Sequence, residues 1–447
     1  MLRRITGAGD HGPVTTPHPG TDGAADEAEH EPVELIRQSG TVQRAGRLAL
    51  ASGHGSYRVK SHMERVGRAL GLDDVKASVA LTEITTTSVR DHIFRTEVSE
   101  VRTVGINADR LAELENYIGD LPAREDVRAI EQELDRIAAK PPLYSPVVNA
   151  LSAGFACGAF AFLNNGGLLE CVGVLVAATA GQYLRRSLIH RGINPFGVTM
   201  LAGAVACLTY LAFIGVIGLF VADPGRHVAG YVSAVLFLVP GFPLVTGALD
   251  LARLDFSAGM SRLTYALMIL FSAAVALWAV SAAVGLEPTP PVALSLYPAL
   301  EWTLLTLASF LGVLGFALMF NSPWRMALGA AAVGMVANVG RLYLVRELDL
   351  PTQAAAAAAA LVVGLLARVI ATPLRVPRLT VSVPAVVIMV PGVAAMRGVF
   401  ELNAGHVLEA LAFMLDAALV VTALSIGLAV SRMLTDRDWT FEARRAL

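Results

Sequence analysis

Residues 239–251 read VPGFPLVTGALDL, and residues 390–402 read VPGVAAMRGVFEL. Both stretches share Val-Pro-Gly, five residues, Gly, two residues, an acidic residue and Leu, and each lies within a long apolar segment. A proline inside a helix removes a backbone donor and clashes with the preceding turn, so each stretch predicts a broken helix. In hydrocarbon, such a break persists only where protein or a water-filled cavity satisfies the freed backbone groups. Two matching breaks indicate a transporter built from internal repeats, with a substrate site between them.

The composition around these stretches is that of a membrane protein. Of the 447 residues, 55% are hydrophobic and 16% are charged, against about 25% charged in an average soluble domain. Charged residues are frequent in the first 140 residues and sparse afterwards, which predicts a soluble region followed by a membrane region. A net charge of −2 gives no indication of nucleic-acid binding. No apolar signal sequence precedes the soluble region, so it is expected to stay in the cytoplasm.

The sequence predicts no metal ion and no cofactor. Cys157, Cys171 and Cys207 lie in apolar segments without metal-ligand spacing, which is typical of packing residues. Gly53-His54-Gly55-Ser56 lacks the arrangement of a nucleophile elbow, and a turn between two helices is the favoured interpretation.

Five regions are expected along the chain. Residues 1–31 carry almost no large apolar residues and are expected to be a disordered tail, whose scattered histidines are solvated. Residues 32–142 carry the pattern of a small cytoplasmic α/β domain, and residues 435–447 form a cytoplasmic tail. Between them, residues 143–290 and 291–434 are two expected repeats of five membrane helices each.

Within the soluble region, hydrophobic periodicity predicts helices and strands in a definite order. A helix containing residues 59–70 should end at Gly71, and residues 75–81 alternate as a half-buried strand does. The run ITTTSV at 84–89 and the alternation of residues 94–98 predict two further strands. Residues 111–118 and 127–137 predict two helices, the second ending at Pro141-Pro142.

The remainder contains ten apolar stretches, each long enough to cross roughly 30 Å of hydrocarbon. The expected spans are 144–163, 168–184, 196–221, 228–250, 263–285, 298–320, 325–345, 353–371, 381–400 and 406–431. Lys and Arg concentrate in the loops that a cytoplasmic N-terminus would place inside, as the positive-inside rule requires. Both termini are therefore expected on the cytoplasmic side of the cell membrane.

A second internal echo supports the repeat. Phe160-Ala161 followed by Asn164-Asn165 resembles Phe316-Ala317 followed by Asn321, which gives a shift of about 150 to 156 residues. Each half then holds five spans, and an odd number of spans places the second copy in the opposite orientation. The predicted fold is an α-helical polytopic membrane protein of two inverted five-helix repeats, with broken fourth and ninth helices and a preceding α/β domain.

The breaks carry the predicted substrate site. After each Pro-Gly the chain should restart as a half-helix whose first N–H groups are unpaired, and these groups favour an anion such as a carboxylate. Gln182 and Asn338 fall at equivalent repeat positions and are further candidates to bind the substrate. The predicted substrate-binding residues are Pro240, Gly241, Phe242, Pro391, Gly392, Val393, Gln182 and Asn338. The alternative is that each Val-Pro-Gly only kinks a packed helix.

Three acids are candidates for proton coupling or gating. Asp416 lies well inside the last apolar stretch, where a carboxylate usually faces a cavity or a partner. Asp250 and Glu401 end the two repeated stretches, roughly 15 Å of helix beyond each break and too far for direct contact with a central site. A structural hydrogen bond for Asp416, and interfacial water for the other two acids, remain open alternatives.

Several segments resemble the threonine/serine exporter family. The stretch LALASGHGSYRVKSHMERVGRALGL at 48–72, the first membrane segment with FAFLNNGGLLE, and LVPGFPLVTGALDL resemble that family's motifs in their order and spacing. The resemblance covers most of residues 33–434. It implies ten membrane helices, a cytoplasmic N-terminal domain, and export of threonine, serine or similar molecules driven by the proton gradient.

The sequence thus predicts a secondary active exporter of small amino acids in the inner cell membrane, with no enzymatic activity. Its expected partners are a small amino acid, protons and membrane lipid; the sequence leaves homo-oligomer formation open and gives no nucleic-acid partner. Two alternatives remain. One is a membrane-anchored enzyme acting through the N-terminal domain, although no convergent titratable residues are evident there. The other is a passive channel or a scaffold for partner proteins.

Overall fold

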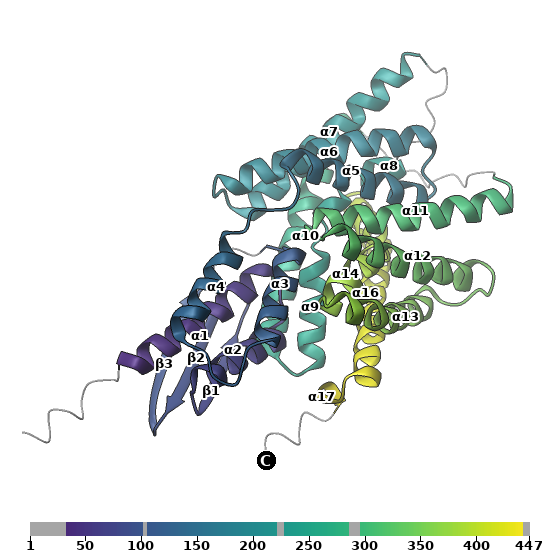
Figure 1. Ribbon diagram of the computed structural model, residues 1–447. Helices are drawn as coiled ribbons and strands as arrows, with labels where there is room; N and C mark the ends of the chain where they lie inside the picture. Colours follow the sequence, from purple (N-terminus) through teal and green to yellow (C-terminus); the bar gives the residue numbers. More distant parts are fainter. Residues whose placement is uncertain (1–32, 102–104, 221–227, 286–295, 441–447) are drawn as a thin grey trace, which may run out of the picture.

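The computed structural model describes residues 33–101, 105–220, 228–285 and 296–440, so the predicted N-terminal tail lies outside the described residues. An α/β domain comes first, and a large helical region follows it (Figure 1). The elements of the α/β domain are α1 (Val33–Ser52), α2 (Ser56–Leu70), β1 (Asp74–Val79), β2 (Glu83–Arg90), β3 (Ile93–Glu100), α3 (Ala108–Gly119) and α4 (Val127–Ala139). Each helix and strand predicted from residues 59–137 is present.

The α/β domain is organised around one antiparallel sheet of order β1-β2-β3. The apolar face of α2 is buried with Val59, Met63 and Val66 fully inside the domain core. This helix ends at Gly71, whose φ of 84° suits a residue without a side chain. The alternating residues of β3 that begin with Phe94 lie on the outer face of the sheet and not in the core, because Phe94 is 70% exposed. The domain core therefore lies on the helix-covered side of the sheet.

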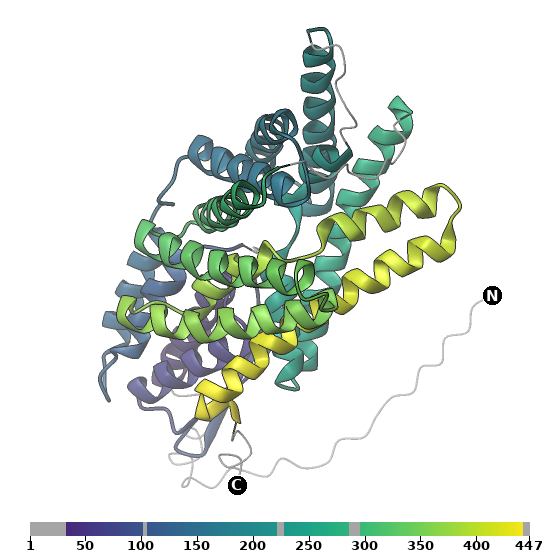
Figure 2. The same ribbon diagram turned by 90° about the vertical axis from the view of Figure 1, so that its right-hand side faces the viewer.

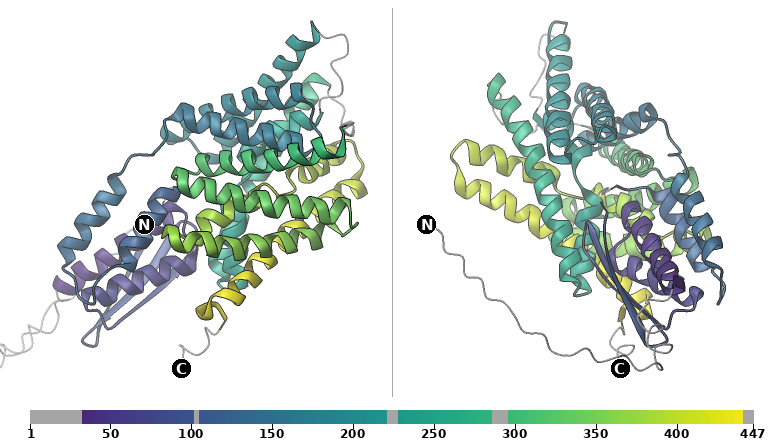
Figure 3. Two further views of the ribbon diagram at one scale, coloured as in Figure 1. Left: turned by 45° about the vertical axis from the view of Figure 1, so that its right-hand side comes forward. Right: turned by 90° about the vertical axis from the view of Figure 1, so that its left-hand side faces the viewer.

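The helical region follows the ten predicted stretches closely. Its first half holds α5 (Pro146–Leu163), α6 (Leu168–His190), α7 (Pro195–Gly218), α8 (Val228–Ser233), η1 (Leu236–Leu238), α9 (Gly241–Ala252) and α10 (Phe256–Val284). Its second half holds α11 (Pro298–Met319), α12 (Trp324–Arg346), α13 (Thr352–Leu374), α14 (Arg378–Val387), α15 (Gly392–Asn403), α16 (Val407–Thr435) and α17 (Arg437–Thr440). Figure 3 shows α11, α12 and α13 running side by side.

The number of helices suited to crossing a membrane is seven, or nine if each bent pair counts as one span, among the described residues. The predicted span at 168–184 corresponds to α6, which is 23 residues long but is not among those seven. Glu170, Arg185 and Arg186 on this helix explain its lower apolar character. The structure thus supports a polytopic helical protein, and α6 is a long helix of the helical region that falls outside the set suited by composition to cross a membrane.

Both Val-Pro-Gly stretches break their helices, as predicted. The chain bends by 62° between residues 230–238 and α9, and by 53° between α14 and α15. The two prolines have nearly the same backbone angles, with φ −81° and ψ 62° at Pro240 and φ −79° and ψ 58° at Pro391. After each break, the chain continues through a short helix of 12 residues and then a long one of 29 residues. Figure 2 shows the second of these hairpins, α15 with α16.

The two breaks lie against each other. A Cβ built on Gly241 would overlap the Val387 side chain, and a Cβ built on Gly392 would overlap the Leu236 side chain. Each glycine therefore lets its backbone approach a side chain from the other half of the helical region. The absence of a side chain at both positions is a packing requirement of this crossing.

Two other features occur in both halves of the helical region. Asn165 and Asn321 both adopt left-handed backbone angles, with φ of 65° and 62°, at the turns before α6 and α12. Those two helices are each 23 residues long. Asparagine tolerates this conformation better than most residues, so its recurrence at both turns has a local physical reason.

Candidate functional site

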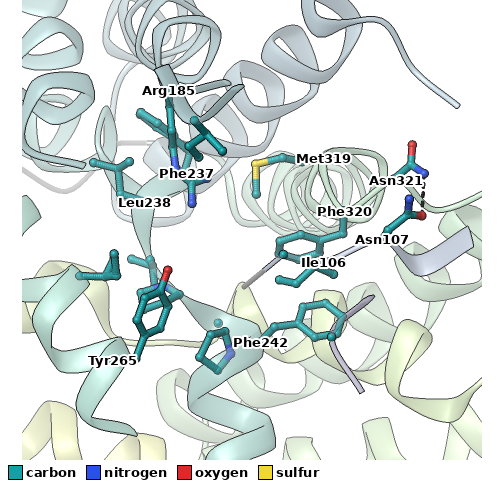
Figure 4. Close-up of a pocket in the computed structure, with 18 of the residues that line it drawn as sticks. Ile106, Asn107, Arg185, Phe237, Leu238, Phe242, Tyr265, Met319, Phe320 and Asn321 are labelled. Carbon is teal, nitrogen blue, oxygen red and sulfur yellow. Dashed lines mark hydrogen bonds between the residues drawn. The ribbon is translucent and has the colours of Figure 1, made fainter. Parts of the chain in front are cut away.

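A cavity of about 280 Å³ lies at the first break, between the α/β domain and the helical region. Its floor is the segment from Phe237 to Pro243, and α5, α6 and α10 supply polar side chains around it. The end of α11 and the loop before α3 close another side, where Asn321 Nδ2 donates a hydrogen bond to Asn107 Oδ1 at 2.8 Å (Figure 4). Small-molecule sites span roughly 300–1,000 Å³, so this cavity suits a small solute.

The polar side of the cavity is built on α6. Gln182 Nε2 donates to Asn149 Oδ1 on α5 at 2.9 Å, which fixes the amide beside the cavity. One turn along the same helix, Arg185 also lines the cavity, with its Nη1 3.5 Å from Gln182 Oε1. Within the described residues, no carboxylate forms a salt bridge with Arg185 or contributes to the cavity lining. The guanidinium therefore supplies positive charge that an anion could neutralise.

Arg262 on α10 also lines the cavity, but its charge is already compensated. Its Nε lies 3.2 Å from Asp250 Oδ2, and both side chains are only 4% exposed. Its Nη1 and Nη2 donate to Thr246 Oγ1 at 3.0 Å and to the His54 carbonyl at 2.8 Å. Arg262 thus connects α9, α10 and the α/β domain, and Arg185 and Arg186 remain the cationic groups of the lining.

The opposite side of the cavity is aromatic. Phe242 is 2% exposed and packs edge to face on Phe320, with ring centroids 5.0 Å apart. Tyr265 on α10 lies across the open space from these rings, and Met319 lies above them in Figure 4. A cavity with one cationic and one aromatic side can hold a solute that has a charged group and a short apolar part.

Four of the predicted substrate-binding residues line this cavity: Pro240, Gly241, Phe242 and Gln182. Fewer backbone N–H groups are free at the first break than the sequence predicts. Gly241 donates its N–H to the Val239 carbonyl at 2.9 Å, and residue 243 is a proline. In the described chain, Phe242 is then the only one of the first three α9 residues with an N–H that lacks a backbone acceptor. Side chains rather than the half-helix end therefore supply most of the polar lining.

The other four predicted residues lie outside the cavity lining. Pro391, Gly392 and Val393 form the second break, which packs behind the first through the Gly392–Leu236 contact. Asn338 is fully buried and donates to Ser309 Oγ on α11 at 2.8 Å. Gln182, predicted to occupy the equivalent position in the first repeat, lines the cavity, so the two residues have different surroundings. The structure places the two breaks together, and this cavity lies beside the first of them.

The three predicted acids have separate surroundings. Asp250 is 3% exposed and pairs with Arg262, so it is not in interfacial water. Asp416 is partly buried and accepts a hydrogen bond from Gln353 at the start of α13. Glu401 lies 2.9 Å from His406 Nδ1 at the turn into α16. None of the three lines the cavity.

A second polar cluster lies in the α/β domain and was not recognised from the sequence. It consists of His54 in the α1–α2 turn, His62 on α2 and Glu115 on α3. Burial, assisted by the neighbouring His54, lowers the pKa of His62 to about 3. Burial raises the pKa of Glu115, but the adjacent His54 ring and Arg58 guanidinium outweigh it and lower that pKa to about 2. Because Glu115 comes from a distant helix, local spacing could not reveal the cluster.

Comparisons with known proteins agree on one family. The family model described as "Putative threonine/serine exporter" matches residues 41–284, and the model described as "Threonine/Serine exporter, ThrE" matches residues 305–434. The chain is similar to the "Probable succinate transporter subunit YjjP" of Escherichia coli strain K12, with 28% identity over 238 residues, 52% of this chain and 89% of the relative. The protein of the same name from Klebsiella aerogenes is 28% identical over 219 residues, 48% of this chain and 81% of the relative. No solved structure matches. The chain belongs to the threonine/serine exporter family.

Proposed function

We propose that this protein is a secondary active exporter of threonine, serine or a similar small carboxylate-bearing metabolite, with the cavity at the first break as its substrate site. The carboxylate of the substrate binds Arg185 and the Gln182 amide, and its short side chain packs toward Phe242. The observation that carries the proposal is Arg185, a cavity-lining arginine without a salt bridge to any described carboxylate. Arginine presents a planar donor fork that matches a carboxylate.

Transport requires the cavity to open in turn to each side of the membrane. The two crossed breaks join the two halves of the helical region, so a rigid-body rotation of one half against the other would move the cavity floor. Five spans in each half, as the sequence predicts, would give the halves opposite orientation and allow such rocking. We further propose that both termini are cytoplasmic in the inner cell membrane and that Asp416 takes up the coupled proton.

A second candidate substrate is a dicarboxylate. The cavity lining contains three arginines and no carboxylate among the described residues, so nothing acidic is positioned to bind the ammonium group of an amino acid. The relatives named as succinate transporter subunits favour the same class. An amino acid would have to direct its ammonium group at backbone or amide oxygens, whereas a dicarboxylate could engage Arg185 and Arg186 together.

The test is counterflow in proteoliposomes with labelled threonine, labelled serine and labelled succinate, each with and without a pH gradient. We expect uphill movement of at least one substrate that depends on the gradient. Arg185→Gln should lower that flux about tenfold or more, since losing a charged hydrogen bond costs roughly 1.5–3 kcal/mol. Arg191→Gln is the matched control, because that exposed arginine follows the same helix and does not line the cavity.

Each outcome separates the candidates. Movement of threonine or serine alone would eliminate the dicarboxylate, and movement of succinate alone would eliminate the amino acids. Equal flux in Arg185→Gln and Arg191→Gln would remove the cavity as the substrate site. Gradient-independent flux would instead favour a passive channel, and no flux of any substrate in an intact preparation would contradict the transporter proposal.

A further inference from the structure

The cluster of His54, His62 and Glu115 has the composition of a metal site. One potential ligand atom from each residue lies within 4.8 Å of the other two. The imidazole rings are 4.8 Å apart between centroids at an interplanar angle of 73°, and the two histidines are 1% and 5% exposed. The three side chains come from a turn and two helices that pack together inside the α/β domain.

Several polar atoms of the cluster are buried without a hydrogen bond. In the described part of the chain these atoms are His54 Nδ1, His54 Nε2, His62 Nδ1 and Glu115 Oε2. His54 Nε2 and Glu115 Oε2 approach to only 3.5 Å. A buried polar atom without a partner costs about 1–3 kcal/mol, and native proteins rarely collect several in one place. A ligand that accepts lone pairs from all three residues would remove this cost.

We propose that His54, His62 and Glu115 bind one divalent transition-metal ion of the zinc class. Two imidazole nitrogens and one carboxylate form an established Zn²⁺ donor set, whereas Mg²⁺ and Ca²⁺ prefer oxygen ligands alone. With metal–ligand bonds of about 2.0–2.2 Å, tetrahedral ligand atoms lie about 3.4 Å apart. Small side-chain rotations therefore suffice to close the present arrangement around an ion.

The surroundings of Glu115 fit this assignment. Its Oε2 faces His54, and its Oε1 lies 3.6 Å from Arg58 Nη2. The metal takes the first oxygen, and Arg58 orients the carboxylate through the second, as outer-shell partners of metal ligands commonly do. The Arg58 side chain is 39% exposed, so solvent screens its repulsion of the cation.

A fourth coordination position is available. A second cavity of about 60 Å³ is lined by His54, Glu115 and Arg58 on the α/β domain and by residues of the helical region opposite. One water molecule occupies about 30 Å³ in the liquid, so a water ligand fits there. Arg253, Arg378 and Arg432 of the helical region also line this cavity.

The site lies where the α/β domain docks on the helical region. The carbonyl of His54 accepts from Arg262, and two residues later Ser56 donates its N–H to Asp250 Oδ1 at 3.2 Å. Glu115 lies on α3, which begins where Ala108 N–H donates to the Phe320 carbonyl at 3.0 Å. A metal held by His54 and Glu115 would tie these two docking contacts to one centre. The ion would therefore brace the α/β domain against α9, α10 and α11 and restrain the proposed motion of the cavity floor.

The test uses the full-length protein in detergent, stripped with chelator and titrated with Co²⁺ and Zn²⁺. We expect about one ion per chain and a visible Co²⁺ absorption typical of nitrogen and oxygen ligands in a four- or five-coordinate site. His62→Gln and Glu115→Gln should each weaken binding at least tenfold. His92→Gln is the matched control, because that histidine lies exposed in the β2–β3 turn of the same domain.

Separate measurements test whether the variants fold and whether the metal braces the α/β domain against the helical region. Thermal unfolding without metal verifies that the variants fold, and Zn²⁺ should raise the Tm of the wild type and His92→Gln but not of His62→Gln. Hydrogen exchange should show Zn²⁺-dependent protection that extends from residues 54–62 to residues 250–262. The metal site would be overturned if the protein bound no metal, or if His62→Gln and His92→Gln bound it equally well. Protection from hydrogen exchange that stays limited to residues 54–62 would overturn the bracing role. Neither readout depends on transport, so the proposed function can fail independently.

Discussion

Among single residues, the buried pair of Asp250 and Arg262 has the largest expected effect on stability. Each side chain is 4% exposed, and Asp250 also accepts the Ser56 N–H. Removing one partner of a buried ion pair leaves an uncompensated charge, which costs about 3–5 kcal/mol. Asp250→Asn should therefore lower the Tm of the full-length protein strongly, and differential scanning calorimetry in detergent measures it.

The Arg346–Glu301 pair provides the comparison. Both of its side chains are 32% exposed, so water already solvates the charges. Surface pairs contribute about 0–1 kcal/mol, and Glu301→Gln should change the Tm little. Equal Tm values for Asp250→Asn and Glu301→Gln would show that the buried pair does not hold α9 and α10 against the α/β domain.

Substitution of Asp416 distinguishes a structural role of this residue from a role in proton coupling. An asparagine keeps an oxygen that can accept from Gln353 but cannot bind and release a proton. If Asp416 carries the proton, Asp416→Asn should retain exchange of substrate across the membrane while losing uphill export driven by a pH gradient. Proteoliposome flux with and without the gradient measures both. Retained gradient-driven export in Asp416→Asn would assign the residue to the hydrogen bond alone.

At the scale of helices, the sequence predicts boundaries well because hydrophobic runs and proline act locally. Pro240 and Pro391 remove a donor wherever they stand, so both breaks could be anticipated. The cavity lining could be predicted only in part. Gln182 and Asn338 are predicted to be equivalent by repeat, yet Gln182 lines the cavity whereas Asn338 is buried against Ser309 of α11, because neighbouring helices pack differently around each. The position of Arg185 in the cavity likewise depends on α10 and the end of α11, which line the same cavity from other parts of the chain.

The crossing of the two breaks gives a prediction about packing. A methyl group on Gly241 would overlap Val387 on α14, so Gly241→Ala should destabilise the protein by about 1–3 kcal/mol. Val387→Ala should partly rescue it by removing the methyl groups that clash, which a double-mutant cycle detects as a favourable coupling energy. Gly340→Ala is the control, because a Cβ at that glycine of α12 meets nothing within 4 Å. Independent, additive effects of Gly241→Ala and Val387→Ala would contradict the crossing.

Over the whole molecule, the chain joins two helical halves, each with a Val-Pro-Gly break that is followed by helices of 12 and 29 residues. One family model covers residues 41–284 and the other covers residues 305–434. The contacts between the halves are close: a Cβ on Gly315 of α11 would lie 2.6 Å from the Ser152 carbonyl of α5. We therefore expect packing between α5 and α11 to hold the two halves together even without the covalent connection.

Division of the chain between residues 290 and 291 tests this directly. We expect the separately expressed pieces 1–290 and 291–447 to co-purify when produced in the same cells and to recover transport, although less fully than the intact chain. A connection raises the effective concentration of its ends to about the millimolar range, so its removal weakens assembly without abolishing the interface. Gly315→Leu in the second piece should prevent co-purification, because its side chain cannot enter the α5–α11 contact. Pieces that fail to associate, while the intact chain stays folded under the same conditions, would show that the two halves depend on their connection.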